Sequence, residues 1–199
     1  MKRASRQTKR ENKRKQQNQR RFLIIGGISL LFIIVIVIIL LSVNRSPGST
    51  GLLGDEVVIA SAAHVPDGTQ PGPYNSNPPA GGTHYETDYE AKFFQESDLA
   101  ALAKYPEGYL VHSLEHGYVI FWYNCQLPNT DCPALKQTIQ QVMDDTGGTK
   151  LIAFPWLDMD VPLAMTSWGR ILKFTTPDPA LMKQFVERNR YQAPEPNAP

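Results

Sequence analysis

Two histidines and a glutamate stand close together in the stretch His112-Ser113-Leu114-Glu115-His116-Gly117. The chain has only four histidines, and the other two, His64 and His84, lie in one segment rich in proline and glycine. Imidazole is a common protein ligand of transition metals, and clustered histidines suit zinc or copper. These residue types therefore predict a copper or zinc site made by His64, His84, His112 and His116.

The spacing of His112 and His116 restricts how their rings can meet. Nitrogens bound to one metal lie roughly 3–4 Å apart, because a Zn–N bond is about 2.0–2.1 Å long. Along a strand the two residues would be about 13 Å apart, at about 3.3 Å per residue. Only a helical turn or a tight bend brings them together, and Gly117 suits a chain that turns there. We expect such a bend between two β-rich runs, 109–114 and 118–123, which are predicted to form a strand pair.

The same stretch matches the H-x-x-E-H pattern of inverzincin peptidases, in which the histidines bind zinc on a helix and the glutamate activates water. Gly117 and the apolar run after it argue against a continuing helix, so a hydrolase with Glu115 as its base is an alternative. A further alternative is a non-catalytic interaction module of the cell envelope, in which the histidines are structural. We favour binding over catalysis and assign no catalytic residue.

The segment 62–85 contains five prolines and four glycines, a composition that excludes a helix or a central strand. Its histidines and aromatic residues, set among rigid turn residues, predict an ordered loop laid over the domain, and long ordered loops are often functional. Within this segment Tyr74 and Tyr85 are expected to support the metal ligands. Glu115 is expected to do the same from the other segment.

The chain begins with a basic tail and a long apolar run. Residues 1–21 hold ten Lys and Arg against one acid, and we expect a disordered tail that touches anionic lipid rather than nucleic acid. Residues 22–43 are uncharged and would span about 33 Å as a helix, enough to cross a membrane. The positive charges precede this helix, which places the N-terminus in the cytoplasm and the rest of the chain outside. We therefore expect an uncleaved single-pass membrane anchor.

The compartment bears on the two cysteines, Cys125 and Cys132, which enclose six residues. Outside the cytoplasm a disulfide between them is the simpler interpretation. Residues 44–54 are rich in glycine, serine and proline and are predicted to be a linker. From Arg45 onward the chain has ten Lys and Arg against eighteen acids, so this part is acidic. Membrane lipid and a protein of the cell envelope are the partners we expect.

Residues 55–195 are predicted to form one compact α+β domain with a mixed sheet of four or five strands and two main helices. One helix should begin at Cys132-Pro133 and present an apolar face, and the last should follow Thr176-Pro177. The remaining predicted elements are strands at 56–60, 150–154 and 163–174, the last broken near Trp168-Gly169, a short helix at 97–103, and a frayed tail from Ala193.

Several uncommon strings in this chain resemble a bacterial family of membrane-anchored extracytoplasmic proteins known only as a domain of unknown function. The resemblance covers about residues 56–195 and departs at Ala80-Gly81, where a Thr-Ser-like pair is expected. It implies a shared fold and topology and supplies no reaction. It also implies that the loop and the His-Glu-His stretch form one site. The matching strings are His64-Val65-Pro66, Tyr74, Asn77-Pro78-Pro79, Gly82-x-His84-Tyr85, Val111-His112-x-Leu114-Glu115-His116-Gly117-x-Val119 and Thr166-x-Trp168-Gly169-Arg170.

Overall fold

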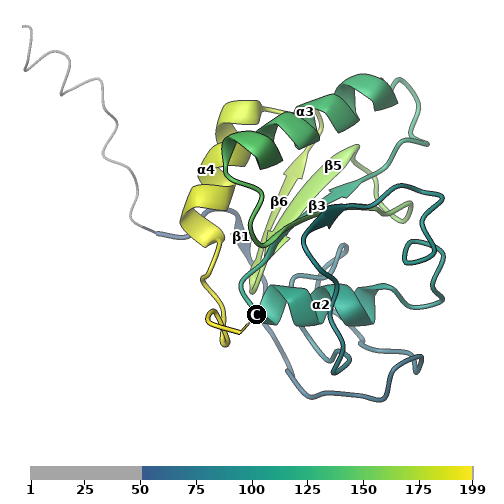
Figure 1. Cartoon of the computed structure of the whole chain (residues 1–199), viewed down its shortest axis with the longest axis vertical. Helices are drawn as coiled ribbons and strands as arrows, with labels where there is room; N and C mark the ends of the chain where they lie inside the picture. The colour runs from purple at the N-terminus through teal and green to yellow at the C-terminus, as the bar shows by residue number, and fades with distance from the viewer. Residues whose placement is uncertain (1–50, 199) are drawn as a thin grey trace, which may run out of the picture. The chain divides into compact units, whose positions relative to one another are not determined.

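A computed structural model describes residues 51–198 of the protein (Figure 1). These residues form an α+β fold with a mixed six-stranded sheet and three helices. The predicted tail 1–21, the predicted membrane helix 22–43 and most of the predicted linker lie outside the described residues. Within 51–198, no helix has the length and apolar character needed to span a bilayer.

Four strands of five residues each make up the centre of the sheet, and two strands of two residues each lie at its edges. The strand order is β1-β6-β5-β3-β4-β2. Strand β4 pairs in parallel with β2 and with β3, whereas the other pairs are antiparallel. The strands are β1 (Asp55–Glu56), β2 (Lys92–Phe93), β3 (Val119–Tyr123), β4 (Leu151–Pro155), β5 (Leu163–Ser167) and β6 (Arg170–Phe174).

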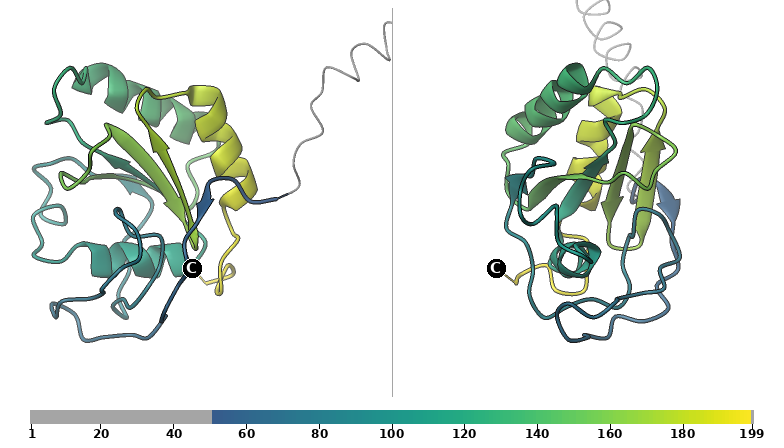
Figure 2. Two further views of the ribbon diagram at one scale, coloured as in Figure 1. Left: turned by 180° about the vertical axis from the view of Figure 1, so that it is seen from behind. Right: turned by 90° about the vertical axis from the view of Figure 1, so that its right-hand side faces the viewer.

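Alternate residues of β3 face two separate apolar clusters, because side chains along a strand point to opposite faces of the sheet. Val119 and Phe121 pack into the cluster that includes the inner faces of α3 (Cys132–Asp145) and α4 (Pro179–Asn189). Ile120 packs with residues of α2 (Glu107–Glu115) on the other face. Figures 1 and 2 show α3 and α4 on one side of the strands and α2, surrounded by long loops, on the other.

Helix α3 confirms the prediction from the sequence. The Asp131 side chain accepts a hydrogen bond from the backbone N–H of Ala134, and proline occupies the first turn. The apolar face predicted from the spacing is the buried face of the helix, made by Leu135, Ile139, Val142 and Met143. The strand predictions at 150–154 and 163–174 are also confirmed, with the break at Trp168-Gly169 between β5 and β6.

The strand predicted at 109–114 is wrong, because Glu107–Glu115 form the helix α2. Leu110 and Leu114 are fully buried against β3, and this packing outweighs the β preference of the local residues. The predicted turn does occur at Gly117, whose φ of +85° ends the helix and redirects the chain into β3. His112 and His116 therefore lie one turn of helix apart.

Four other expectations need correction. Residues 97–103 form successive turns rather than a helix, and the first strand is limited to Asp55–Glu56. Helix α4 is capped by Asp178, whose carboxylate accepts hydrogen bonds from two backbone N–H groups of the first turn, rather than at Thr176-Pro177. The tail beyond Ala193 is attached rather than frayed, since the backbone N–H of Glu195 donates to the Glu115 carbonyl at 3.0 Å.

Candidate metal centre

A pair of backbone hydrogen bonds brings the two ends of the proline-rich loop together. The N–H of Val65 donates to the His84 carbonyl at 2.7 Å, and the N–H of His84 donates to the Ala63 carbonyl at 3.2 Å. This bridge places the rings of His64 and His84 with their centroids 4.6 Å apart, although twenty residues separate them along the chain. The prediction of an ordered loop is confirmed, since its backbone is tied to itself at this point.

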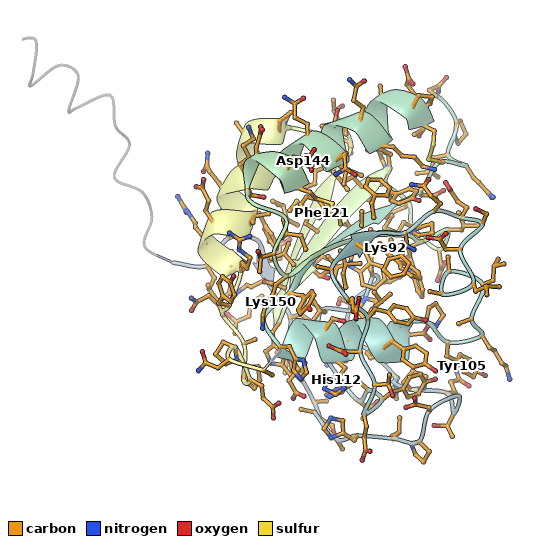
Figure 3. The ribbon with its side chains drawn as sticks, viewed as in Figure 1. Lys92, Tyr105, His112, Phe121, Asp144 and Lys150 are labelled. Atoms are coloured by element: carbon orange, nitrogen blue, oxygen red, sulfur yellow. A yellow bond between two sulfur atoms is a disulfide. The ribbon has the colours of Figure 1, made fainter. Side chains whose placement is uncertain are left out.

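Helix α2 adds the third ring. The His112 centroid lies 5.2 Å from that of His64 and 5.1 Å from that of His84. One ring nitrogen from each of the three residues lies within 4.8 Å of the others, a group that could hold a metal ion. His112 projects from α2 on the side away from the sheet (Figure 3), toward the loop that carries the other two rings.

Two backbone carbonyls fix the orientation of the buried rings. Nδ1 of His112 donates to the Tyr85 carbonyl at 2.6 Å, and Nδ1 of His84 donates to the Gly82 carbonyl at 2.7 Å. A carbonyl oxygen can only accept, so Nδ1 carries the proton in both rings. In the neutral ring Nε2 then has the free lone pair, which is the arrangement that metal-binding histidines use.

Glu115 places a carboxylate beside these rings. Its Oε2 lies 2.9 Å from Nε2 of His84 and 3.9 Å from Nε2 of His64, and its side chain is only 7% exposed. A proton must lie between Glu115 and His84 for the shorter contact to be a hydrogen bond, because neither the carboxylate nor a neutral Nε2 donates. A bound cation could replace that proton. Glu115 thus lies beside two of the three rings, and its support of metal ligands stays a prediction.

Burial lowers the pKa of His112 below its ordinary value of 6.5, although the hydrogen bond to the Tyr85 carbonyl acts in the opposite direction. Positive charge on the neighbouring His116 or His84 lowers this pKa further. His112 is consequently neutral under conditions in which an ordinary histidine begins to charge. A neutral imidazole is the form that binds a metal.

The fourth histidine, His116, contacts His112 but is not among the three residues whose ring nitrogens lie within 4.8 Å of one another. The Nε2 atoms of His112 and His116 are 2.9 Å apart. Nδ1 of His116 lies 3.3 Å from Asp88 Oδ2, and Nε2 lies 3.7 Å from Glu195 Oε2. Nδ1 of His116 is buried, and no group among the described residues forms a hydrogen bond with it. Neither acid could be predicted from the sequence, because neither belongs to a motif and only the fold brings them to His116.

The two tyrosines hold the loop segments whose carbonyls orient the rings. Tyr85, besides offering its own carbonyl, donates its hydroxyl to the Thr69 carbonyl at 2.6 Å, and burial raises its pKa. The Tyr74 hydroxyl donates to the Thr83 carbonyl at 3.0 Å, and its ring packs against Gly82. A Cβ at Gly82 would lie 2.6 Å from the Tyr74 ring, so glycine is required there. The tyrosines therefore act on the rings through the backbone.

The departure at Ala80-Gly81 also has a structural consequence. Gly81 has a φ of +140°, and a Cβ there would lie 2.6 Å from Cδ1 of Ile59. A serine could adopt this conformation only with strain, so the chain uses glycine where the resemblance implied a Thr-Ser-like pair. Both flanking histidines keep their positions beside the backbone bridge.

A second group, made by Glu96, Cys125 and Cys132, also has its ligand atoms within 4.8 Å of one another. The two cysteines form the predicted disulfide, so neither offers a thiolate to a metal. The histidine group is thus the stronger candidate for a metal centre among residues 51–198.

Comparison with known proteins adds a family but no activity. No curated protein and no solved structure matches the chain. A family described as a protein of unknown function (DUF3105) matches residues 64–199, a span that includes all four histidines, Glu115 and both cysteines. The chain belongs to this family.

Proposed function

We propose that the protein binds a transition metal, copper or zinc, through His64, His84 and His112. The observation that carries this proposal is the approach of three ring nitrogens to within 4.8 Å of one another. Two of the three rings are fixed by backbone carbonyls, which is the outer support that metal sites need.

We also propose His116 as a fourth nitrogen ligand. Two nitrogens bonded to one metal at about 2.0–2.1 Å are about 2.9 Å apart when the bonds meet at a right angle. The Nε2 atoms of His112 and His116 have this separation of 2.9 Å. Bonds at a right angle suit the tetragonal geometry of Cu²⁺, whereas tetrahedral Zn²⁺ would hold the two nitrogens slightly farther apart.

We further propose that the domain at residues 55–195 lies outside the cell membrane on a single-pass anchor at 22–43. The uncharged run of 22 residues and the ten positive charges before it support this topology. The Cys125–Cys132 disulfide is consistent with an oxidising compartment. Anionic lipid at the basic tail and a protein of the cell envelope are the partners that such a topology implies.

Metal analysis of the full-length chain tests the binding proposal. The protein is purified in mild detergent without a histidine tag or chelator, loaded with Cu²⁺ or Zn²⁺, and freed of excess ion. We expect close to one ion per wild-type chain and a large loss in His84→Ala and His112→Ala, as for deletion of direct ligands. Less than about 0.1 ion per wild-type chain would refute the proposal. Thr138→Ala on α3 is the matched control, because this helix packs on the other face of the sheet.

Metal-dependent hydrolysis remains a second candidate because one observation favours it. The H-x-x-E-H stretch occupies the last turn of helix α2, although the helix ends before Gly117 as expected. Glu115 would then activate a metal-bound water for attack on a peptide or ester carbonyl. Glu115→Gln should abolish such an activity while the metal stays bound, and an activity that persists would exclude Glu115 as the base.

The non-catalytic interaction module is the third candidate. The hydrogen bond from His112 to the Tyr85 carbonyl and the contact of His84 with Glu115 fix the loop to α2 and would do so without a metal. In this case the histidines contribute to folding alone. The comparison of His112→Ala with and without metal, argued in the Discussion, separates this interpretation from metal binding.

A further inference from the structure

Access to the histidine group is uneven. His84 is fully buried and His112 is 7% exposed, whereas the His64 side chain is 42% exposed. Any ion that reaches the two buried rings from solvent would therefore meet His64 first. His64 lies at the start of the loop and is held there by the backbone bridge to His84.

A pocket of about 550 Å³ lies directly beside His64. Its walls come from two short stretches on either side of the bridge, Val65-Pro66-Asp67 and Glu86-Thr87. The Thr87 hydroxyl donates to Asp67 Oδ2 at 2.8 Å and connects the two walls. A cation with six waters occupies about 180 Å³ at about 30 Å³ per water, so the pocket is large enough for a hydrated ion.

The charges at this pocket have one sign. Asp67 and Glu86 are exposed acids, and no lysine or arginine is among the residues that line the pocket. An acidic pocket raises the local concentration of cations and increases their association rate, an effect that salt suppresses. The positions of Asp67 and Glu86 thus favour a small cation over an anionic ligand.

We propose that this pocket is the entrance by which a hydrated divalent cation reaches the histidines, with Asp67 and Glu86 steering it to His64. This inference rests on the proposed metal binding and adds the route and the form in which the metal arrives. The carboxylates act on the rate of capture, and the imidazoles determine the final coordination.

A stopped-flow experiment on the full-length chain in detergent tests the proposal with Cu²⁺ supplied as a simple salt. The Trp168 ring lies 6.1 Å from that of His84, so bound Cu²⁺ should quench its fluorescence. A Trp168→Phe chain identifies this part of the signal. The rate of quenching is measured in Asp67→Asn/Glu86→Gln at low and at high ionic strength. The amide oxygen of Asn can still accept the Thr87 hydrogen bond, so the variant should keep the walls of the pocket together.

We expect association about threefold to tenfold slower in this variant at low salt, and equal to wild type at about 1 M salt, where charges are screened beyond about 3 Å. The extent of quenching at saturation should not change. The matched control is Glu187→Gln/Asp144→Asn, which removes two exposed acids of α4 and α3 and should leave the rate as in wild type.

The outcomes separate this inference from the proposed function. Equal rates in the pocket variant and wild type at low salt would overturn the entrance while metal binding stands. The same slowing in the control pair would also overturn it, because the effect would then come from net charge. An absence of quenching and of bound copper in wild type would refute the metal site itself.

Discussion

The Glu115 carboxylate lies 2.9 Å from Nε2 of His84, and both side chains are buried between α2 and the loop. The Nδ1 of His84 already donates to the Gly82 carbonyl, so this ring is held from both ends. A hydrogen bond between these two groups requires a proton on one of them, and a bound cation could take that proton's place. If the proposed metal site is correct, Glu115 would therefore link the stability of the domain to metal binding.

Substitution of this carboxylate tests the link. We expect Glu115→Gln to lower the free energy of unfolding of the metal-free protein by about 1–3 kcal/mol, because a buried charged partner is lost. Metal affinity should fall about tenfold to hundredfold, as for other groups that orient ligands. Urea unfolding and calorimetric titration measure the two effects. Glu187→Gln on α4 removes an exposed carboxylate and should change neither quantity appreciably. Wild-type values in Glu115→Gln would contradict the assigned role.

His112→Ala separates metal binding from a structural role. In the metal interpretation, Zn²⁺ raises the melting temperature of wild type, since a ligand that binds only the folded state stabilises it. His112→Ala should lose most of this increase as well as the hydrogen bond to Tyr85. Differential scanning fluorimetry with and without Zn²⁺ provides the comparison. If His112→Ala lowers the melting temperature by the same amount with and without Zn²⁺, the histidines are structural.

The lowered pKa of His112 predicts a pH dependence of stability. Its folded pKa lies below the ordinary value of 6.5, so the unfolded chain binds more protons in this range. The contribution of His112 is complete above pH 6.5 and is lost as the pH falls through the folded pKa. We expect the free energy of unfolding of metal-free wild type to decrease more steeply below pH 6.5 than that of His112→Asn. Parallel curves from urea titrations across this range would contradict the prediction.

The helix that carries the site shows why part of this fold could not be predicted. Helix α3 has one buried and one exposed face, so its period is visible in the sequence. In α2, every residue from Leu110 to Glu115 is buried, because the sheet covers one side and the loop covers the other. A helix enclosed in this way has no polar face to reveal its period, and its local residues favour a strand.

Three of the four predicted histidines form the candidate metal group, and their arrangement could not be predicted from the sequence. The types and rarity of the histidines singled out all four, and their joint occurrence in two unusual segments indicated that they meet. The backbone bridge between His64 and His84 has no sequence signal, since it joins residues twenty apart across a closed loop. The contacts of His116 with Asp88 and Glu195 likewise arise only from the fold.

The C-terminal tail lies so close to the end of α2 that a methyl group added at Gly117 should strongly reduce the stability of the domain. A Cβ at Gly117 would lie 2.8 Å from the Tyr191 backbone, and the Tyr191 N–H donates to the Gly117 carbonyl at 2.9 Å. Gly147 has nearly the same φ, +87° against +85°, with nothing within 4 Å of such a Cβ. Gly147→Ala therefore measures backbone strain alone, about 1–2 kcal/mol. Gly117→Ala should lower the free energy of unfolding by about 1–3 kcal/mol more than Gly147→Ala does, because the added methyl group overpacks the contact with the tail. If urea unfolding gives equal losses of unfolding free energy for Gly117→Ala and Gly147→Ala, the tail moves to make room for the methyl group.

Lys150 anchors the same tail beside the site. Its ammonium donates to the carbonyls of His116, Pro196 and Ala198 at 2.7, 3.2 and 2.6 Å, and burial lowers its pKa. Lys150→Met keeps the length of the side chain and leaves three carbonyls without this donor. We expect a loss of about 1–3 kcal/mol in the free energy of unfolding.

Measurement of metal affinity in the same Lys150→Met variant shows whether Lys150 affects only stability or also the metal site. The His116 carbonyl belongs to a candidate ligand, and the tail hydrogen-bonds to Glu115, so release of the tail should loosen both. We expect Lys150→Met to weaken metal binding in calorimetric titration by about threefold to thirtyfold, less than loss of a group that contacts the ligands directly. Lys173→Met is the control, because within residues 51–198 Lys173 pairs only with the exposed Asp160, and the substitution should change stability by less than about 1 kcal/mol. A destabilised Lys150→Met chain with wild-type metal affinity would show that the tail stabilises α2 without positioning His116 or Glu115.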